Sequence, residues 1–413
     1  MPTAPPRQGI VVTGAATALG LVLGVLYVWS VIKGGIPEAW GWSHADKALP
    51  YAVACLTFSL TMLPAGRLQD RSGPRGVAVL GSVLAGAGCI IAGLGGDSLL
   101  AFVLGFGVTT GVGIGFGYAA MTPAAVKWFP PERTGLVAGV VVAGSGLSPL
   151  WIAPLTQVLL DAFAAADAGG RAAVSSTMIA LGASIIVLGS AIALLLRNPP
   201  HHQRGGAAAP TWAPWRAMLK TATFWRLFAT FFVGAAAGLM FIGVAQDLGR
   251  AALGAAAFWA VVVLSIGNAG GRIIAGAISD RLGRQRTLGY AFVAQATVVT
   301  LLAVLPDTSL PLTLTILFLL GLNYGANLSI YPAAAKERFG TANFGLNYGT
   351  LFVAWGLAGL LAPWLWGLVH DLTGSTTPST VAIVAALLLA ALVTHFGARP
   401  GEVDPSTDPA QGT

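Results

Sequence analysis

The chain contains twelve apolar stretches of membrane-spanning length, and this feature limits its possible folds more than any other. With a window of about 19 residues, the stretches lie at 11–33, 49–65, 75–95, 98–121, 135–160, 174–196, 224–245, 253–277, 287–305, 310–331, 345–369 and 377–397. Most can cross about 30 Å of hydrocarbon as a helix that rises 1.5 Å per residue. Charged residues make up only 9% of the 413 residues, against about 25% in soluble domains. We predict an all-α membrane protein with twelve transmembrane helices in the lipid bilayer.

The distribution of Lys and Arg predicts the orientation of these helices. If the N-terminus is cytoplasmic, seventeen of the 22 basic residues fall on the cytoplasmic side and four on the outer side, namely Lys33, Lys47, Arg171 and Arg250. This excess predicts a multi-pass protein of the cell (inner) membrane with both termini in the cytoplasm. The basic residues are dispersed over short loops, whereas nucleic-acid binding needs them gathered on one face. We therefore predict no nucleic-acid partner.

A short motif occurs twice, 210 residues apart. Residues 66–75 read GRLQDRSGPR after the second stretch, and residues 276–284 read GAISDRLGR after the eighth. Repetition at about half the chain length indicates a parallel duplication around an axis along the membrane normal. The expected units are an N-terminal half, a Pro-, Gly- and Ala-rich cytoplasmic linker, a C-terminal half and a cytoplasmic tail, at residues 1–197, 198–220, 221–399 and 400–413.

The charged residues of the two motif copies are candidates for a gate. Asp70, Arg71, Asp280 and Arg281 lie at helix ends, where they can pair with opposite charges or with a facing helix N-terminus. We predict that such pairs hold the cytoplasmic side shut. The alternative is a solvated loop without a gating role.

The duplicated motif resembles the signature of the major facilitator superfamily, and helix number and linker position extend the resemblance over the whole chain. The first copy departs from the pattern, because Pro74 precedes Arg75. The resemblance implies two six-helix halves related by pseudo-two-fold symmetry, and transport by alternating access.

Four further segments resemble the oxalate/formate antiporter family, which is related to the monocarboxylate porters. They are GVLYVWS at 24–30, KWFPPER at 127–133, Asn268 four residues before Arg272, and NYG at 347–349. The resemblance implies a transporter of small organic acids that uses Arg272 to bind its substrate. Oxalate exchangers of this family carry a lysine eight residues after the Asn of NYG, where this chain has Trp355.

Arg272 is the only charged residue well inside an apolar stretch. At that depth an ionisable group costs several kcal/mol unless it faces a cavity, a protein interior or an opposite charge. A planar guanidinium can hold a carboxylate by two parallel hydrogen bonds, and Asn268 shares its helix face at i−4. A dianion needs about two compensating charges and a monoanion one. With Arg272 as the sole buried cation, we predict a monocarboxylate substrate.

Other candidates come from the helices that line the central cavity in this superfamily. In 310–331, Asn323, Asn327 and Tyr331 recur on one stripe, with Tyr324 seven residues before Tyr331. Tyr118 follows a glycine-rich run, and Leu26, Tyr27 and Phe352 are weaker candidates for apolar walls. The predicted substrate-binding residues are Arg272, Asn268, Tyr118, Tyr331, Asn327, Tyr27 and Leu26. The alternative for the polar members is helix packing.

Energy coupling has weaker signals. All fifteen acidic residues lie at helix ends or in loops, and Asp247, His370 and Asp371 are candidates for proton coupling at the outer side. We predict a monomeric proton symporter of an acid such as lactate, pyruvate or formate. Exchange of two monoanions, as in oxalate/formate antiport, stays open, and an anion channel is a remote alternative. No residue cluster typical of an enzyme or metal site appears, so we expect no catalysis, no cofactor and no metal.

Overall fold

The computed structural model describes residues 7–129, 134–166, 172–199, 217–305, 309–339 and 344–396. These ranges contain twelve helical segments that are long and apolar enough to span a membrane, and they contain no strand. The predicted all-α fold is therefore confirmed. Most of the predicted linker and all of the predicted tail lie outside the described residues.

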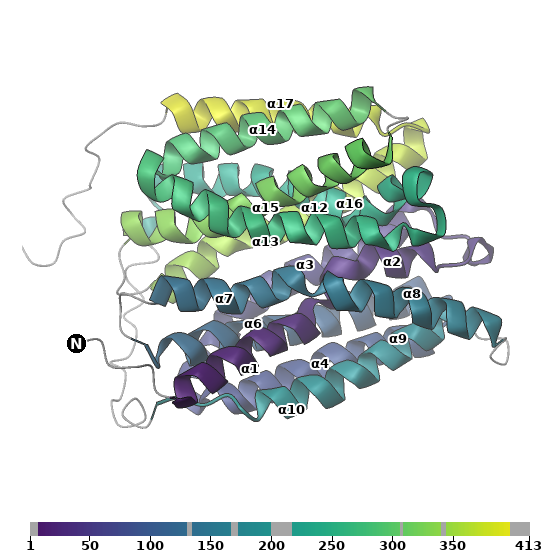
Figure 1. The fold of residues 1–413 in the computed structure, drawn as a ribbon, viewed down its shortest axis with the longest axis horizontal. Coiled ribbons are helices and arrows are strands. Elements are labelled where there is room, and N and C mark those ends of the chain that lie inside the picture. Colours follow the sequence, from purple (N-terminus) through teal and green to yellow (C-terminus); the bar gives the residue numbers. More distant parts are fainter. Residues whose placement is uncertain are drawn as a thin grey trace, which may run out of the picture.

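The N-terminal half contributes six spans (Figure 1). Their elements are α1 (Arg7–Leu23), η1 (Gly24–Val28) and α2 (Trp29–Gly34) in the first span; α3 (His44–Ser72); α4 (Pro74–Leu94); α5 (Leu99–Phe102), η3 (Val103–Thr110) and α6 (Gly111–Val126) in the fourth; α7 (Thr134–Leu147) and α8 (Pro149–Ala165) in the fifth; and α9 (Ala173–Ser184), η5 (Ile185–Gly189) and α10 (Ser190–Ala193) in the sixth. A short 3₁₀ turn, η2 (Glu38–Trp40), precedes α3.

The C-terminal half contributes the other six spans, which are less interrupted. They are α12 (Ala222–Leu253), followed by the turn η7 (Gly254–Ala256); α13 (Phe258–Leu282); α14 (Arg284–Val304); α15 (Leu310–Phe339); α16 (Phe344–Thr373); and α17 (Thr377–Phe396).

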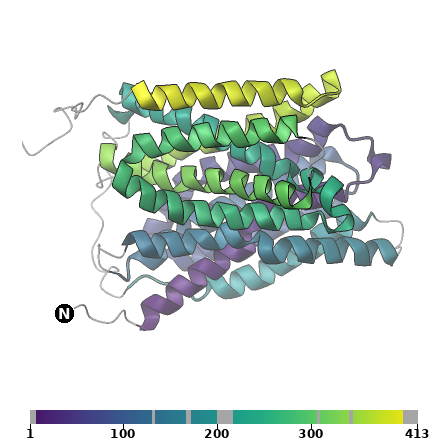
Figure 2. The ribbon, with the colours of Figure 1, turned by 45° about the horizontal axis from the view of Figure 1, so that its top comes forward.

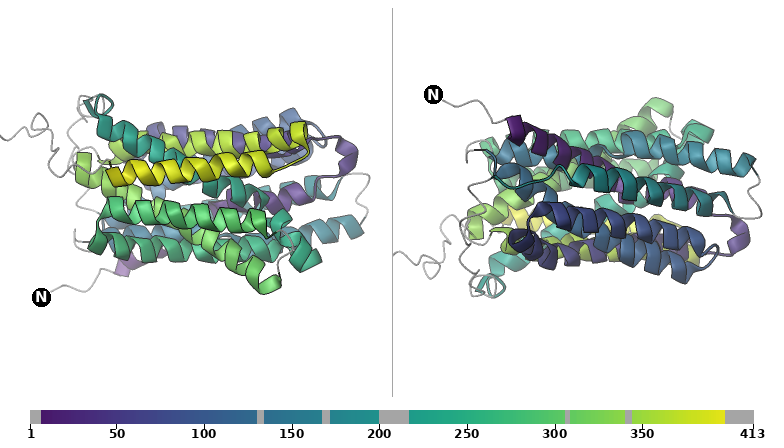
Figure 3. Two further views of the ribbon diagram at one scale, coloured as in Figure 1. Left: turned by 90° about the horizontal axis from the view of Figure 1, so that it is seen from above. Right: turned by 90° about the horizontal axis from the view of Figure 1, so that it is seen from below.

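The two halves lie side by side with their helices along a common direction (Figures 1 and 2). We call the end of the bundle at which α1 begins the Arg7 end, and the end at which α2 finishes the Lys33 end. Close contacts between the halves join α3 to α16, α2 to α12, and α13 to both α7 and α8. The views from above and below show each half as its own bundle (Figure 3). The interface between the halves is thus built from six spans, three from each half.

Glycines bring α13 and α15 into backbone contact. A Cβ atom at Gly271 would lie 1.9 Å from the carbonyl oxygen of Leu322, and one at Gly325 would lie 2.0 Å from that of Asn268. Gly267 and Gly321 are equally close to the facing backbone. Small residues at i and i+4 on both helices permit this approach. The pairing fixes the part of α13 that carries Asn268 and Arg272.

The first span is not a continuous α-helix. Its centre is the 3₁₀ turn η1, which carries Leu26 and Tyr27. At Gly24 the hydroxyl of Ser148, the residue that precedes α8, occupies the space where a Cβ would lie, and that hydroxyl donates a hydrogen bond to the carbonyl oxygen of Gly24 at 3.2 Å. Such breaks within spanning helices are common at functional sites. Here the break orients Tyr27 toward the centre of the molecule.

Candidate functional site

Arg272 lies on α13 at the interface between the two halves and is half-buried. Its Nε donates a hydrogen bond to Oδ1 of Asn268 at 3.2 Å, as the i−4 spacing predicts. Its Nη1 donates to the carbonyl oxygen of Val142 on α7 at 2.9 Å, so the side chain reaches from the C-terminal half into the N-terminal half. These two bonds use two of the five guanidinium N–H donors. The guanidinium also meets the hydroxyls of Tyr27 and Tyr118, so a ligand would share its remaining N–H donors with these tyrosines.

A glycine gives the guanidinium its space. A Cβ atom at Gly146 on α7 would lie 3.6 Å from Cζ of Arg272 and 3.7 Å from Nη2, which is ordinary van der Waals contact. A larger side chain would extend into the guanidinium plane. Gly146 therefore forms one wall of the arginine's site.

Four tyrosines surround Arg272 and interact with it electrostatically. Tyr27 comes from η1, Tyr118 from α6, Tyr324 from α15 and Tyr348 from α16. They are four of the seven tyrosines in the chain, and each half supplies two of them. We call Arg272 and these four residues the tyrosine cage. It combines one cation with hydroxyl groups that can both donate and accept hydrogen bonds.

Apolar aromatic rings back this cage. Trp355 donates a hydrogen bond from Nε1 to the hydroxyl of Tyr324 at 2.8 Å and stacks on Phe352 with ring centroids 5.0 Å apart. Phe58 on α3 makes an edge contact with Tyr118 at 5.3 Å. The ring contacts therefore continue from one half to the other. A ligand in the cage would meet one charge, several hydroxyls and an aromatic wall, which suits a small organic anion.

The structure brings four of the predicted substrate-binding residues together: Arg272, Asn268, Tyr27 and Tyr118. Leu26 neighbours Tyr27 in η1, but its side chain is buried in the hydrophobic core. It contributes to packing under the cage.

Asn327 and Tyr331 are placed differently, since their described contacts are with their own helix and with α12. Nδ2 of Asn327 donates to the carbonyl oxygen of Asn323 at 3.0 Å, and its Oδ1 lies against Gly234. Tyr331 is fully buried and stacks on Phe231 with ring centroids 4.3 Å apart. These contacts favour helix packing, and substrate binding by either residue stays a prediction.

Two cage residues, Tyr324 and Tyr348, were not among the predicted substrate-binding residues, although Tyr324 was noted beside the stripe in 310–331 and Tyr348 within the NYG motif. Tyr348, Phe352 and Trp355 follow the spacing i, i+4 and i+7 on α16, and this aromatic stripe was the available signal. Val142 acts through its backbone and Gly146 through its missing side chain. Neither has a sequence signal that points to Arg272.

The predicted gate residues lie at the Arg7 end. Asp280 pairs with Nη1 of Arg284 at 2.6 Å, and Nε of Arg284 pairs with Glu337 of α15 at 2.9 Å. Both partners belong to the C-terminal half, while Arg71 and Arg281 are exposed. The side chain of Asp70 lies outside the described residues. Arg284 thus links α14 to both α13 and α15, and a latch between the halves stays a prediction.

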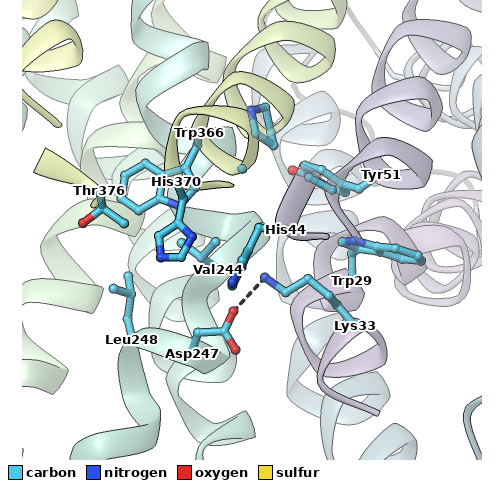
Figure 4. Close-up of a pocket in the computed structure, with 14 residues that line it drawn as sticks. Trp29, Lys33, His44, Tyr51, Val244, Asp247, Leu248, Trp366, His370 and Thr376 are labelled. Atoms are coloured by element: carbon cyan, nitrogen blue, oxygen red, sulfur yellow. Dashed lines mark ion pairs between the residues drawn. The ribbon is translucent and has the colours of Figure 1, made fainter. Parts of the chain in front are cut away.

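Polar contacts between the halves gather at the Lys33 end (Figure 4). Nζ of Lys33 on α2 pairs with Asp247 on α12 at 2.7 Å. The carboxylate of Asp371 on α16 accepts hydrogen bonds from the backbone N–H groups of His44, at 3.0 Å, and Ala45, at 2.8 Å. The rings of His44 and His370 touch, with centroids 4.2 Å apart. The three residues predicted for proton coupling therefore all take part in closing this end.

Twelve described spans in two halves, with Arg272 at the interface between them, define a multi-pass membrane transport protein. The chain belongs to the Major Facilitator Superfamily, because the family model of that description matches residues 10–363 and 240–412.

Three relatives illustrate the likeness. The chain is 26% identical to an uncharacterised transporter of this type from Escherichia coli over 82% of each chain. It is 28% identical to the oxalate:formate antiporter of Oxalobacter formigenes, over 94% of this chain and 91% of that protein. It is 29% identical to human monocarboxylate transporter 11, over 96% of this chain and 84% of that protein.

A solved structure shares the fold. The bacterial homologue of the human lysosomal transporter Spinster, in an inward-facing and occupied conformation, superposes with a TM-score of 0.71 at 17% identity. The match covers 95% of this chain and 97% of that chain. It confirms the predicted major facilitator fold.

Proposed function

We propose that this protein is a secondary active transporter of a small monocarboxylate such as lactate, pyruvate or formate, and that Arg272 binds the carboxylate. The observation that carries the proposal is the position of its guanidinium, which contacts both halves and faces four tyrosines. A carboxylate can replace the Val142 carbonyl oxygen as acceptor and engage two N–H groups at once. The tyrosine hydroxyls suit the hydroxyl or keto group of such an acid.

The choice of a monoanion follows from the charge of the cage. The described partners of Arg272 are uncharged, and Trp355 fills the place where related oxalate exchangers carry a lysine. One buried cation compensates one carboxylate, whereas a dianion would leave a charge unpaired at a cost of several kcal/mol. The names of the relatives agree with a small organic acid as the substrate class.

Alternating access is the proposed mechanism. The ion pair and hydrogen bonds at the Lys33 end hold the halves together there, and the excess of Lys and Arg favours the Arg7 end as the cytoplasmic side. We propose that the structure is an outward-closed state. We also propose that the protein is a monomer in the cell (inner) membrane, with both termini in the cytoplasm. Opening at the Lys33 end requires these contacts to break.

Proton-coupled symport is the form of transport we favour, with Asp247, His370 or Asp371 as the proton site. Each of them takes part in contacts between the halves at this end, and protonation of Asp247 or Asp371 would weaken contacts that must break for opening. The second candidate is exchange of two monoanions. It is favoured by one observation, namely that no carboxylate lies among the described partners of Arg272.

Uptake by proteoliposomes tests the proposal. Wild-type protein is expected to accumulate labelled lactate, pyruvate or formate, with competition by other monocarboxylates but weakly by oxalate. Arg272→Ala, inserted at equal density, is expected to show no uptake above protein-free vesicles. Normal uptake by this variant would refute the central claim.

Two gradients separate the coupling modes. An inward proton gradient drives accumulation by a symporter, whereas an obligate exchanger takes up label only when unlabelled carboxylate is trapped inside the vesicles. A steady current that never saturates with substrate would instead indicate a channel.

A further inference from the structure

We propose that His44, His370 and Asp371 form a binding site for a divalent transition-metal ion, and that the bound ion holds the Lys33 end closed. One candidate ligand atom from each residue lies within 4.8 Å of the other two. Two imidazoles and one carboxylate are a ligand set that suits Zn²⁺ and Ni²⁺, with water completing the shell. His44 begins α3 in one half, and His370 and Asp371 end α16 in the other.

The three side chains are held in place before any ion arrives. Each carboxylate oxygen of Asp371 accepts one backbone N–H at the start of α3 and keeps a lone pair for a metal. A capping box between Ser43 and Asp46 fixes the same helical turn. Gly367 lets α16 approach this turn, since a Cβ there would lie 2.7 Å from the carbonyl oxygen of His44.

One ring nitrogen needs a partner that the described residues do not supply. Nδ1 of His370 is buried and accepts or donates no hydrogen bond within the described part of the chain. A buried polar atom without a partner costs free energy, and an ion or a water molecule in the cluster would satisfy it. The cluster borders a cavity of about 240 Å³ that Trp29, Tyr51 and Trp366 line with apolar surface (Figure 4).

Nearby charges leave room for a dication. Lys33 and Lys47 are the basic groups that act on His44, and Asp247 neutralises Lys33 at 2.7 Å. Asp371 adds a negative charge at the site itself. Among the described neighbours, Lys47 is therefore the one cation without a salt bridge. Its ammonium group sits on a flexible four-carbon side chain and can move away from a bound ion.

The ligands come from both halves, so the site is complete only when the Lys33 end is closed. An ion that binds one conformation and not the other shifts the equilibrium toward the state it binds. This consequence rests on the proposed alternating access, whereas metal binding itself does not. Zn²⁺ on the Lys33 side is expected to slow transport without competing with the carboxylate.

Metal binding is measured by titration calorimetry on purified protein without an affinity tag. His201 and His202 in the linker could bind metal independently, so all variants carry His201→Ala and His202→Ala. We expect one Zn²⁺ per chain, with affinity reduced more than about tenfold, or about 1.4 kcal/mol, by His44→Ala or His370→Ala. His395→Ala at the Arg7 end is the matched control. Equal affinity in all variants, or no binding to the background protein, would overturn the site.

The second part of the proposal, that the bound ion holds the Lys33 end closed, we call the clamp. It is tested by measuring a distance between the two halves, so that its failure can be told apart from failure of the transport proposal. Spin labels at Asp97→Cys and Ser309→Cys, which are exposed positions at the Lys33 end of opposite halves, are expected to shift to one short distance when Zn²⁺ is added. The shift should vanish in His44→Ala. Zn²⁺ bound without any shift would refute the clamp, and a shift in protein that transports no carboxylate would refute only the proposed function.

Discussion

Arg272 donates a hydrogen bond from Nη1 to the backbone carbonyl oxygen of Val142, so the one charged group at the centre of the described spans joins the two halves of the protein. In the proposed function, a substrate carboxylate can compete with this contact. A carboxylate is the stronger acceptor for a guanidinium, and its binding would exchange a link between the halves for a link through the ligand. Substrate binding and movement of the halves are then the same event at this site.

Arg272→Lys tests whether geometry matters beyond charge. Lysine keeps the positive charge, but it cannot make two parallel hydrogen bonds to a carboxylate. We expect substrate affinity to fall by about 2–5 kcal/mol, as when a buried hydrogen-bonded charge pair loses a partner. Equilibrium binding of labelled substrate measures this, with the melting curve in detergent as the control for folding. Affinity equal to wild type would contradict paired hydrogen bonding.

Gly146→Val tests the space beside the guanidinium. A valine would extend beyond the Cβ position, which already lies 3.6 Å from Cζ of Arg272, and we expect it to displace the guanidinium and abolish uptake. Gly146→Ala should retain most activity, because its Cβ makes ordinary contact. Gly139→Val, about two helical turns away on the same helix with open space around it, is the matched control. Uptake by Gly146→Val equal to that of Gly139→Val would contradict the assigned role.

Gly271→Ala tests the backbone contact between α13 and α15. The new methyl group would meet the carbonyl oxygen of Leu322 at 1.9 Å, so the helices must separate at a cost of at least about 1–3 kcal/mol. A lower melting temperature and lower expression are the expected results. Gly270→Ala, which meets nothing within 4 Å, should behave as wild type. Equal melting temperatures would show that the helices are not in backbone contact.

Trp355→Lys tests whether the number of cations in the cage decides between a monocarboxylate and a dicarboxylate substrate. A second cation in the aromatic wall would favour a dianion, so oxalate should compete better and lactate worse than in wild type. Trp355→Phe removes the hydrogen bond to Tyr324 without adding charge and serves as the control. Competition assays in proteoliposomes give the ratio directly. If the folded Trp355→Lys variant shows the same ratio of oxalate to lactate competition as wild type, the charge of the cage does not determine substrate selectivity.

Asp247→Asn tests the role of the closing ion pair. The variant leaves Lys33 without its salt bridge, and because Asp247 is 41% exposed the change in stability should stay within about 0.2–1 kcal/mol. If Asp247 is the proton site, uptake should lose its response to a proton gradient while exchange persists. Lys33→Gln, which breaks the same pair from the other side, should keep the response. Identical pH profiles for wild type and Asp247→Asn would exclude this carboxylate.

Much of the fold was predictable because each span carries its own signal. A long apolar stretch must become a helix in lipid, where every backbone polar group needs an internal partner. Arg272 stood out for the same reason, since a lone charge at that depth needs a role. The duplicated motif predicted two halves without any knowledge of their packing.

The cage was predictable only in part because helical periodicity identifies a face but not its neighbour. Tyr324 and Asn327 are three residues apart on α15 and both lie against glycines of α12, Gly238 and Gly234, yet Tyr324 also meets Trp355 of α16. His44 and His370 are 326 residues apart in sequence, and nothing local connects them. Which helices meet, and at what depth, is decided by packing over the whole chain.

The glycine contact between α13 and α15 also has a mechanical consequence. With backbone against backbone, there are no side chains at the seam to change rotamer or slide. Asn268, Arg272 and Tyr324 are therefore expected to move as one rigid unit. The cage can then change shape only where this unit faces Tyr27, Tyr118 and Val142. If the proposed site is correct, the two halves move relative to each other across the binding site, and Arg272 moves with the C-terminal half.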